Sequence, residues 1–455
     1  MTPLFYMLGV VIFVVAILAS IGLHELGHMI PAKKFGGKVS QYFIGFGPTV
    51  WSTQRGETEY GVKAVPLGGY VKIVGMLPPG AEELDEDREH PVYDEQGQRV
   101  VRVRKSNTGM FTQLISDARA AEWEHIRPED SERLFYKMAW WKKVVVMAGG
   151  PTVNILIAFF IFSAVFATYG NAGDVEPDAG QPVLSTVSKC VIPYVEQRTD
   201  CRSTDPESPA AEAGLLPGDR IVEFNGTPVT DWSQLRTLIR SNDNGDAVIV
   251  FVRDGEQMTG TTNTTVEARP TSLTDETLRQ VGFLGVTPTQ HFVTGGVFYT
   301  LSQMGTMTVD TVQALGTLPV KVWGVAKAIV GVEERAADSP VSIVGGGRLA
   351  GETVSHESFP IQEKTVFLLM LIAGFNFFIG MFNFIPLLPL DGGHIAGALY
   401  EAARRGVARL RRRPDPGYVD VAKLLPIAYV VGAAVLVMGV VLIVGDLVVP
   451  IHLQS

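Results

Sequence analysis

The feature that most constrains this chain is the motif His24-Glu25-Leu26-Gly27-His28 at the end of an apolar run. Residues 4–20 before it are uncharged and mostly apolar, a length that suits a membrane span. In a helix, His24 and His28 lie one turn apart on one face. Two neutral imidazoles so placed can bind one Zn²⁺, and Glu25 can act as a general base toward water. The alternative is a helix end whose histidines extend to the lipid headgroups without binding a metal.

Composition limits the class of protein. Of the 455 residues, 46% are hydrophobic and only 19% are charged, which predicts a membrane protein with a sizeable soluble part. The net charge of −9 argues against nucleic acid as the main partner. Two cysteines, Cys190 and Cys201, are too few for a Cys-rich zinc motif. Because a basic n-region and a small-residue cleavage site are missing, we expect residues 4–23 to be a retained span.

Three further apolar runs, near 144–169, 366–390 and 425–449, are long enough to cross a membrane. Basic residues follow the first run, precede the second run and lie between the third and fourth runs. Acidic residues, in contrast, follow the second run. The positive-inside rule therefore predicts that both termini and the long segment after the second run lie outside the cell. The basic residues are Lys33, Lys34, Lys38, Lys142, Lys143, Arg404, Arg405, Arg409, Arg411, Arg412, Arg413 and Lys423.

This topology makes the first and third spans run in the same direction. The histidine pair ends the first span, and Asp391 ends the third, after Asn383-x-x-Pro386-x-x-Pro389. Two histidines and one carboxylate are therefore expected at a similar depth. Such a set, with its fourth position open, is typical of catalytic zinc.

A segment with alternating apolar residues and several turns, 39–76, follows the first span. Residues 49–53 and 60–65 are predicted to form short strands of a β-hairpin that dips toward the site from the cytosolic side. Its edge can bind an extended substrate by strand addition. An ordinary cytosolic loop domain is the alternative. The acidic run at 82–87 is typical of a solvated surface.

The second span begins with Gly149-Gly150-Pro151, and Asn154 follows. Small residues allow close helix packing. Asn154 has two interpretations that the sequence leaves open: an interhelical hydrogen bond, or a position near the reacting carbonyl.

The segment after the second span predicts a compact outer domain at 183–288 with short strands and a helix capped by Asp231. A disulfide between Cys190 and Cys201 is expected if this side is oxidising, and two free thiols are the alternative. An amphipathic interfacial helix is expected within 289–364. The Gly-rich stretch 340–347 predicts a turn or a re-entrant segment, not a helix.

Together these motifs resemble the site-2 protease family of intramembrane zinc metalloproteases, in its RseP-like bacterial branch. The resemblance covers nearly the whole chain, and the single PDZ-like domain with a cysteine-bearing loop resembles actinobacterial members. It rests on His24-Glu25-x-x-His28, Pro66-Leu67-Gly68-Gly69-Tyr70, Gly150-Pro151-x-x-Asn154, the PDZ-like segment, and Asn383-x-x-Pro386-x-x-Pro389-x-Asp391-Gly392.

The resemblance implies that His24, His28 and Asp391 hold Zn²⁺, with Glu25 as the base. It also implies that Asn383 contacts the substrate near the scissile bond. The substrates of such proteins are single-span membrane proteins already trimmed outside, often anti-sigma factors and sometimes signal-peptide remnants. The implied location is the bacterial plasma membrane, with the active site near the cytosolic side.

The expected fold is a multi-pass α-helical membrane protein with four transmembrane helices, a cytosolic-side membrane β-hairpin and one extracytosolic PDZ-like α+β domain. The expected segments are a first span with the motif at 1–30, a cytosolic loop at 31–140 with the hairpin at 39–76, a second span at 141–169, a linker at 170–182, the PDZ-like domain at 183–288, the interfacial region at 289–364, a third span with the aspartate ligand at 365–391, a basic segment at 392–423 and a fourth span at 424–449.

A competing hypothesis is a PDZ-bearing membrane adaptor with a structural zinc site. Structural zinc normally has four protein ligands, and His394 is the candidate fourth ligand in this sequence.

Overall fold

The computed structural model divides the chain into two compact units. Unit 1 comprises Met1–Val165 and Gly296–Ser455, and unit 2 comprises Phe166–Gly295. The acidic run at 82–87 lies outside the described residues. The residues described are 2–78, 92–93, 99–100, 115, 117–119, 126, 128–175, 182–194, 201–270, 278–288, 292–336, 338–356 and 359–451.

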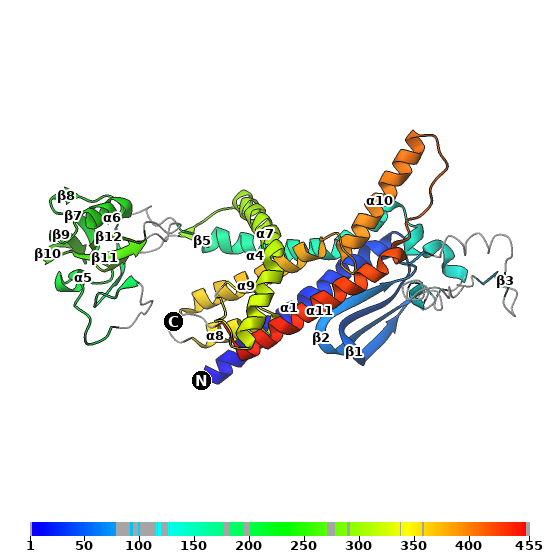
Figure 1. Ribbon diagram of the computed structural model, residues 1–455, viewed down its shortest axis with the longest axis horizontal. Coiled ribbons are helices and arrows are strands. Elements are labelled where there is room, and N and C mark those ends of the chain that lie inside the picture. The colour runs from blue at the N-terminus through cyan, green and yellow to red at the C-terminus, as the bar shows by residue number, and fades with distance from the viewer. Residues whose placement is uncertain are drawn as a thin grey trace. The chain divides into compact units, whose positions relative to one another are not determined.

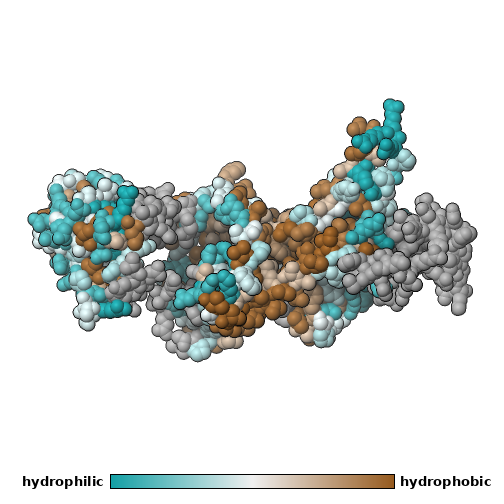
Figure 2. Space-filling view, viewed as in Figure 1, coloured by the Kyte–Doolittle hydropathy of each residue, from teal (hydrophilic) through white to brown (hydrophobic). Residues whose placement is uncertain are grey.

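In its described part, unit 1 contains four helices that are long and apolar enough to cross a membrane. Lipid offers no hydrogen-bond partners to the backbone, so a spanning segment must satisfy its own N–H and C=O groups as a helix does. Figure 2 shows hydrophobic side chains gathered over the helices of unit 1. The four predicted spans are confirmed as helices of spanning length. They are α1 (Thr2–Lys34), α4 (Trp140–Thr168), α9 (Ile361–Asn383) and α11 (Leu425–Val448), all labelled in Figure 1.

The third span ends earlier than predicted. Helix α9 stops at Asn383, and a loop at 384–390 leads to helix α10 (Asp391–Leu410). Pro386 and Pro389 lie in this loop, where each lacks an N–H and disfavours helix in the residue before it. Asp391 is therefore the first residue of α10 and not the last residue of a span. The predicted basic segment at 392–423 also contains most of this helix.

A long β-hairpin follows α1, as predicted, but its strands are longer than expected. β1 (Val39–Arg55) pairs with β2 (Thr58–Ile73) in an irregular antiparallel register. Residues 41–44 of β1 pair with 59–62 on one side and with 69–72 on the other. The bent hairpin therefore forms one sheet of four strand segments, in which the end of β2 is an edge.

The described residues between unit 2 and α9 include two helices. Helix α7 (Val297–Ile329) matches the predicted interfacial helix in place, and it is not among the four spanning candidates. The Gly-rich stretch was expected to be non-helical, and this prediction is wrong, because α8 (Ile343–Ser355) contains most of it. The glycines of α8 are buried, and Ala350 contacts α1 so closely that a Cβ on Gly9 would lie 2.4 Å from its carbonyl oxygen.

A buried ion pair fixes the start of α8. Asp446 of α11 lies 2.8 Å from Arg335, and the side chains are only 2% and 4% exposed. The same carboxylate accepts hydrogen bonds from the backbone N–H groups of Ser342 at 2.6 Å and Gly345 at 3.2 Å. It therefore occupies the positive end of the helix, which offsets the low helix propensity of glycine.

Asp446→Asn is expected to lower the free energy of unfolding by about 3–5 kcal/mol, because Arg335 would remain buried without a counter-charge. Thermal unfolding of the purified protein measures the change. The control is Asp338→Asn, which breaks the exposed pair with Lys321 and should have little effect. An unfolding temperature that Asp446→Asn leaves unchanged would contradict the assignment.

Unit 2 has a β-sheet with the order β10-β9-β7-β8 and a core that includes Phe224, Leu235 and Ile249. Asp231 caps α6 (Trp232–Ser241) by accepting from the N–H of Gln234 at 2.9 Å, as the sequence predicted. The predicted linker is not wholly irregular, because β5 pairs with β14. The strands are β5 (Asn171–Val175), β6 (Leu184–Val187), β7 (Arg220–Phe224), β8 (Thr227–Pro228), β9 (Asp246–Arg253), β10 (Glu256–Asn263), β11 (Thr265–Pro270), β12 (Leu278–Phe283), β13 (Val286–Pro288) and β14 (Phe292–Val293), with a short helix α5 (Pro209–Glu212).

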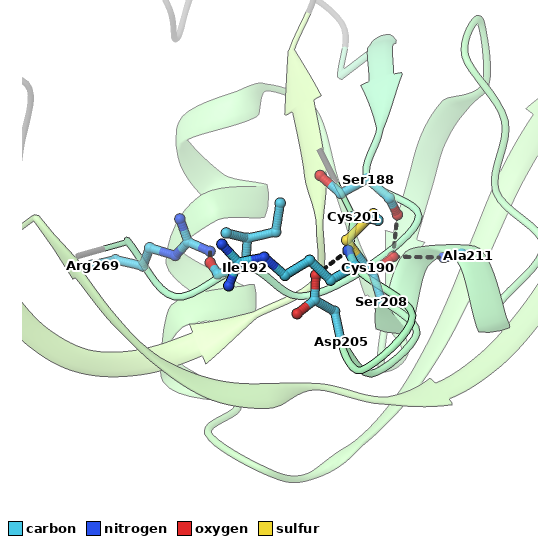
Figure 3. The surroundings of a disulfide bond; sticks show 9 residues. Ser188, Cys190, Ile192, Cys201, Asp205, Ser208, Ala211 and Arg269 are labelled. Atoms are coloured by element: carbon cyan, nitrogen blue, oxygen red, sulfur yellow. Dashed lines mark hydrogen bonds between the residues drawn. A yellow bond between two sulfur atoms is a disulfide. The ribbon is translucent and has the colours of Figure 1, made fainter. Parts of the chain in front are cut away.

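Cys190 and Cys201 form a disulfide in unit 2, with their Cα atoms 5.9 Å apart (Figure 3). The loop that it closes is tied to the rest of the unit on both sides. Arg269 donates a hydrogen bond to the Ile192 carbonyl at 3.1 Å. Ser208, which contacts Ser188, accepts from the N–H of Ala211 at 3.1 Å.

Candidate active site

Two histidines of α1 and the first residue of α10 meet at one point in unit 1. His24 Nε2 lies 3.2 Å from His28 Nε2. Asp391 Oδ2 lies 3.4 Å from His24 Nε2 and 3.3 Å from His28 Nε2. The helix places the histidines on one face, and the proline-containing loop after α9 turns the aspartate toward them. These side chains form a group that can hold a metal ion.

The donor set fits zinc. Tetrahedral ligands about 2.0–2.1 Å from a zinc ion lie about 3.3–3.4 Å from one another, close to the three separations observed. His28 Nδ1 lies 2.8 Å from the carbonyl oxygen of Val146. A carbonyl only accepts, so the ring proton is on Nδ1 and the lone pair of Nε2 faces the other donors. The three atoms are therefore preorganised for a cation.

Helix α4 packs against the two histidines at Gly150, where its backbone carries no side chain. A Cβ on Gly150 would lie 2.3 Å from His28 Nε2 and 2.7 Å from His24 Nε2. The backbones of α1 and α4 are also in close contact beside it, because a Cβ on Gly149 would lie 2.0 Å from the Gly27 carbonyl oxygen. Only a residue without a side chain leaves room for the imidazoles, and for an ion between them, at position 150.

A cavity of about 460 Å³ opens beside the donor atoms. Glu25, residues 68–71 of β2, and both candidate asparagines line it. A Cβ on Gly69 would lie 3.1 Å from Glu25 Cγ, so the edge of the hairpin packs closely against the candidate base. The structure thus brings all the predicted site residues of unit 1 to one cavity.

The two asparagines differ in their hydrogen bonds. Asn383 Nδ2 donates to the Ile379 carbonyl of its own helix at 3.1 Å. Asn154 is 1% exposed, and its Oδ1 is buried without a hydrogen-bond partner among the described residues. A buried amide oxygen at a cavity wall is costly unless a ligand or water satisfies it. This oxygen can accept a hydrogen bond from a donor group bound in the cavity.

His394, the candidate fourth ligand, lines the same cavity but does not belong to the metal-binding group found in the described part of the chain. Burial lowers the pKa of its imidazole to about 4, so the ring is neutral at pH 7. The group found in the described residues offers three ligand atoms, so a four-coordinate ion held there would keep one position open.

Sequence reasoning missed the second layer of this site. The carbonyl that orients His28 belongs to Val146, and Met147 also lines the cavity. Nothing in their local pattern marks these two residues, because an apolar residue in a span looks alike whether it faces lipid or a cavity. Gly150 was interpreted as a small residue for helix packing and as part of the family motif, and its proximity to both imidazoles was not predicted.

Comparisons with known proteins agree with this geometry. The model of Peptidase family M50 matches residues 12–419. The zinc metalloprotease Rip1 of Mycobacterium tuberculosis strain H37Rv is 34% identical over 460 residues, covering 98% of this chain and 99% of the relative. Rip1 of Mycolicibacterium smegmatis is also 34% identical, covering 98% of each. The putative zinc metalloprotease mll0638 of Mesorhizobium japonicum is 25% identical over 406 residues and covers 87% of each.

The family match spans most of the chain, the similarity to Rip1 extends from end to end, and the ligand geometry suits zinc. The apolar helices place such an enzyme in a membrane. The chain belongs to peptidase family M50, the site-2 protease family, and is a membrane zinc metalloprotease.

Proposed function

We propose that this protein is an intramembrane endopeptidase of the bacterial plasma membrane. Its substrate is a single-span membrane protein that another protease has already shortened outside the cell, such as an anti-sigma factor. Remnants of signal peptides are a second substrate class, because they too are apolar membrane segments without a folded outer domain. The observation that carries the proposal is that the metal-binding group, Glu25 and an accessible cavity share one unit with four apolar helices.

His24, His28 and Asp391 would hold the zinc ion. When bound, zinc supplies a Lewis acid that polarises a carbonyl and lowers the pKa of water to about 7. Glu25, which packs against the end of β2 at Gly69, accepts the proton of the attacking water and then delivers it to the leaving amine. Asn154 and Asn383 offer amide groups on the cavity wall for the reacting carbonyl and the neighbouring peptide.

The substrate must leave its helix before its scissile amide can react, because helical carbonyls are held in hydrogen bonds. Pairing with a strand edge replaces those bonds, so no buried group is left unsatisfied. Residues 68–71 of β2 line the cavity. We therefore propose this end of β2 as the pairing edge, whereas the sequence alone suggested the hairpin at residues 49–65.

The basic flanks of the spans support a topology with the hairpin and α10 on the cytosolic side and unit 2 outside. In this topology unit 2 contains the PDZ-like domain at 183–288, and the active site lies toward the cytosolic side.

Metal removal tests the enzymatic proposal. Purified protein in lipid nanodiscs should cleave a trimmed single-span reporter, lose this activity in a chelator that strips zinc, and regain it when zinc is added back. The reaction depends on the ion because the three ligands alone provide no Lewis acid. Mass spectrometry of the fragments locates the cut. Full cleavage by demonstrably zinc-free protein, or a cut outside the span of the reporter, would refute the proposal.

Unit 2 is proposed to exclude substrates that still carry a folded outer domain. Deletion of residues 183–288 should then allow an untrimmed reporter to be cut, whereas the full chain cuts only the trimmed form. Cleavage of the trimmed reporter by both proteins is the control for folding. If the deletion variant cuts the trimmed form and still rejects the untrimmed one, unit 2 is not the filter.

A further inference from the structure

Helix α10 has an exposed apolar stripe on the side that faces away from the rest of unit 1. Four side chains form this stripe, within an arc of about 100° on the helical wheel. Their exposed fractions are large for apolar residues of a packed helix. They are Leu399 at 49%, Tyr400 at 60%, Val407 at 48% and Leu410 at 85%.

The opposite side of α10 is fixed to the rest of the unit. Glu401 is 2% exposed and lies 2.7 Å from Lys143 of α4. Arg405 pairs with the same glutamate at 3.3 Å, and Ala398 is buried. This ionic contact prevents the helix from rotating, so the apolar stripe remains on the outside.

Uncompensated positive charge gathers at the end of the same helix. Arg404 and Arg405 have partners within the fold. Four further arginines are exposed, and no ion pair of the described residues involves them. An apolar stripe that ends in unpaired arginines is the pattern of a helix that lies at an anionic lipid surface. The four are Arg409, Arg411, Arg412 and Arg413.

The position of α10 in unit 1 agrees with such a surface. The Lys143–Glu401 contact ties the middle of α10 to the first turn of α4, where Trp140 and Trp141 are 40% and 46% exposed. Exposed tryptophans at the end of a span mark the headgroup region. From this level α10 diverges from the other helices of the unit (Figure 1). If it continued straight into water, Leu410 would lie about 13 Å beyond the interface.

We propose that α10 lies in the membrane interface and that its terminal arginine cluster binds the headgroups of anionic phospholipids, with the apolar stripe in the acyl region. The choice of the inner leaflet rests on the proposed topology, but the lipid contact does not. Charge complementarity selects anionic lipid as the occupant of this surface. Because Asp391 is the first residue of α10, the same helix connects the lipid surface to the metal-binding group.

Cysteine labelling tests the contact without any assay of proteolysis. Both native cysteines are in the disulfide, so a new thiol is the only one that reacts. Val407→Cys and Pro414→Cys are both exposed in the protein alone, and they differ only in whether lipid is expected to cover them. In nanodiscs that contain phosphatidylglycerol, a membrane-impermeant maleimide should label Val407→Cys about tenfold more slowly than it labels Pro414→Cys.

The charge requirement has its own measurement. The triple change Arg409→Gln, Arg411→Gln and Arg413→Gln should weaken phosphatidylglycerol binding, followed by native mass spectrometry, by about a hundredfold, since each basic side chain near an anionic surface contributes about fivefold. The control removes the same charge from unit 2 with Arg236→Gln, Arg240→Gln and Arg279→Gln, and it should bind the lipid as the unmodified protein does.

Three results would overturn the proposal: equal labelling of the two cysteines, equal lipid binding by both triple variants, or protection of Val407→Cys that rises with protein concentration and not with phosphatidylglycerol. The last result would assign the stripe to a second copy of the chain. Zinc content and cleavage by the same preparations report separately on the proposed enzymatic function.

Discussion

Glu25→Gln is expected to reduce cleavage of a trimmed single-span reporter by at least about 10²–10⁴-fold, the usual contribution of a general base. Glutamine keeps the size of the side chain but cannot accept the proton of water at neutral pH. Glu25 is not part of the three-membered metal-binding group. Zinc content should therefore stay near one ion per chain, as expected for an intact three-ligand site.

The control for this prediction is Glu363→Gln, which changes an exposed carboxylate in the first turn of α9. It should leave cleavage unchanged. Undiminished cleavage by Glu25→Gln would favour the adaptor hypothesis, in which zinc is only structural. In cells, membrane stubs that accumulate with Glu25→Ala, identified by proteomics, would name the natural substrates.

Gly150→Ala is expected to weaken zinc binding by at least about 10–100-fold, the range seen when the surroundings of metal ligands are disturbed. The new methyl group would lie 2.3 Å from His28 Nε2, so the imidazole must rotate away from Asp391 or α4 must move. Zinc content after dialysis against graded chelator concentrations measures the loss, and cleavage should fall with it.

Two glycine variants separate the possible causes of that loss. Gly439→Ala in α11 adds a methyl group where no atom lies within 4 Å, and it should retain zinc. Gly149→Ala meets the Gly27 backbone and not the imidazoles, so it reports on helix packing alone. Full zinc affinity in Gly150→Ala would mean that the imidazoles do not rely on the space at this position.

The sequence carried enough local information to predict the spans and the chemistry of the site. A run of apolar residues can span lipid only as a helix, so length and composition predict it. The spacing of His24 and His28 places their side chains on one face in any helix. The direction of the spans then predicted that Asp391 would reach the same depth as the histidines, and in the structure it lies 3.3–3.4 Å from both Nε2 atoms.

Predictions failed where tertiary packing outweighs local propensity. Glycine disfavours helix, yet α8 forms because its buried glycines allow close contact with α1 and because Asp446 caps it from a distant helix. The basic segment at 392–423 was not expected to contain α10, because its arginines were interpreted only as markers of orientation. The bending of the hairpin, with residues 41–44 paired on both sides, was not predicted because register depends on pairing across the sheet.

By itself, the sequence determined the four apolar helices found in the described part of the chain and a histidine pair on one helical face, since periodicity and length act within a single segment. The tertiary structure alone decided which atoms share the cavity: the Val146 carbonyl on His28, the bare backbone of Gly150 beside both imidazoles, and the end of β2 beside Glu25. These contacts join residues that are distant in the chain, and close packing between helices, which no local pattern encodes, sets their distances.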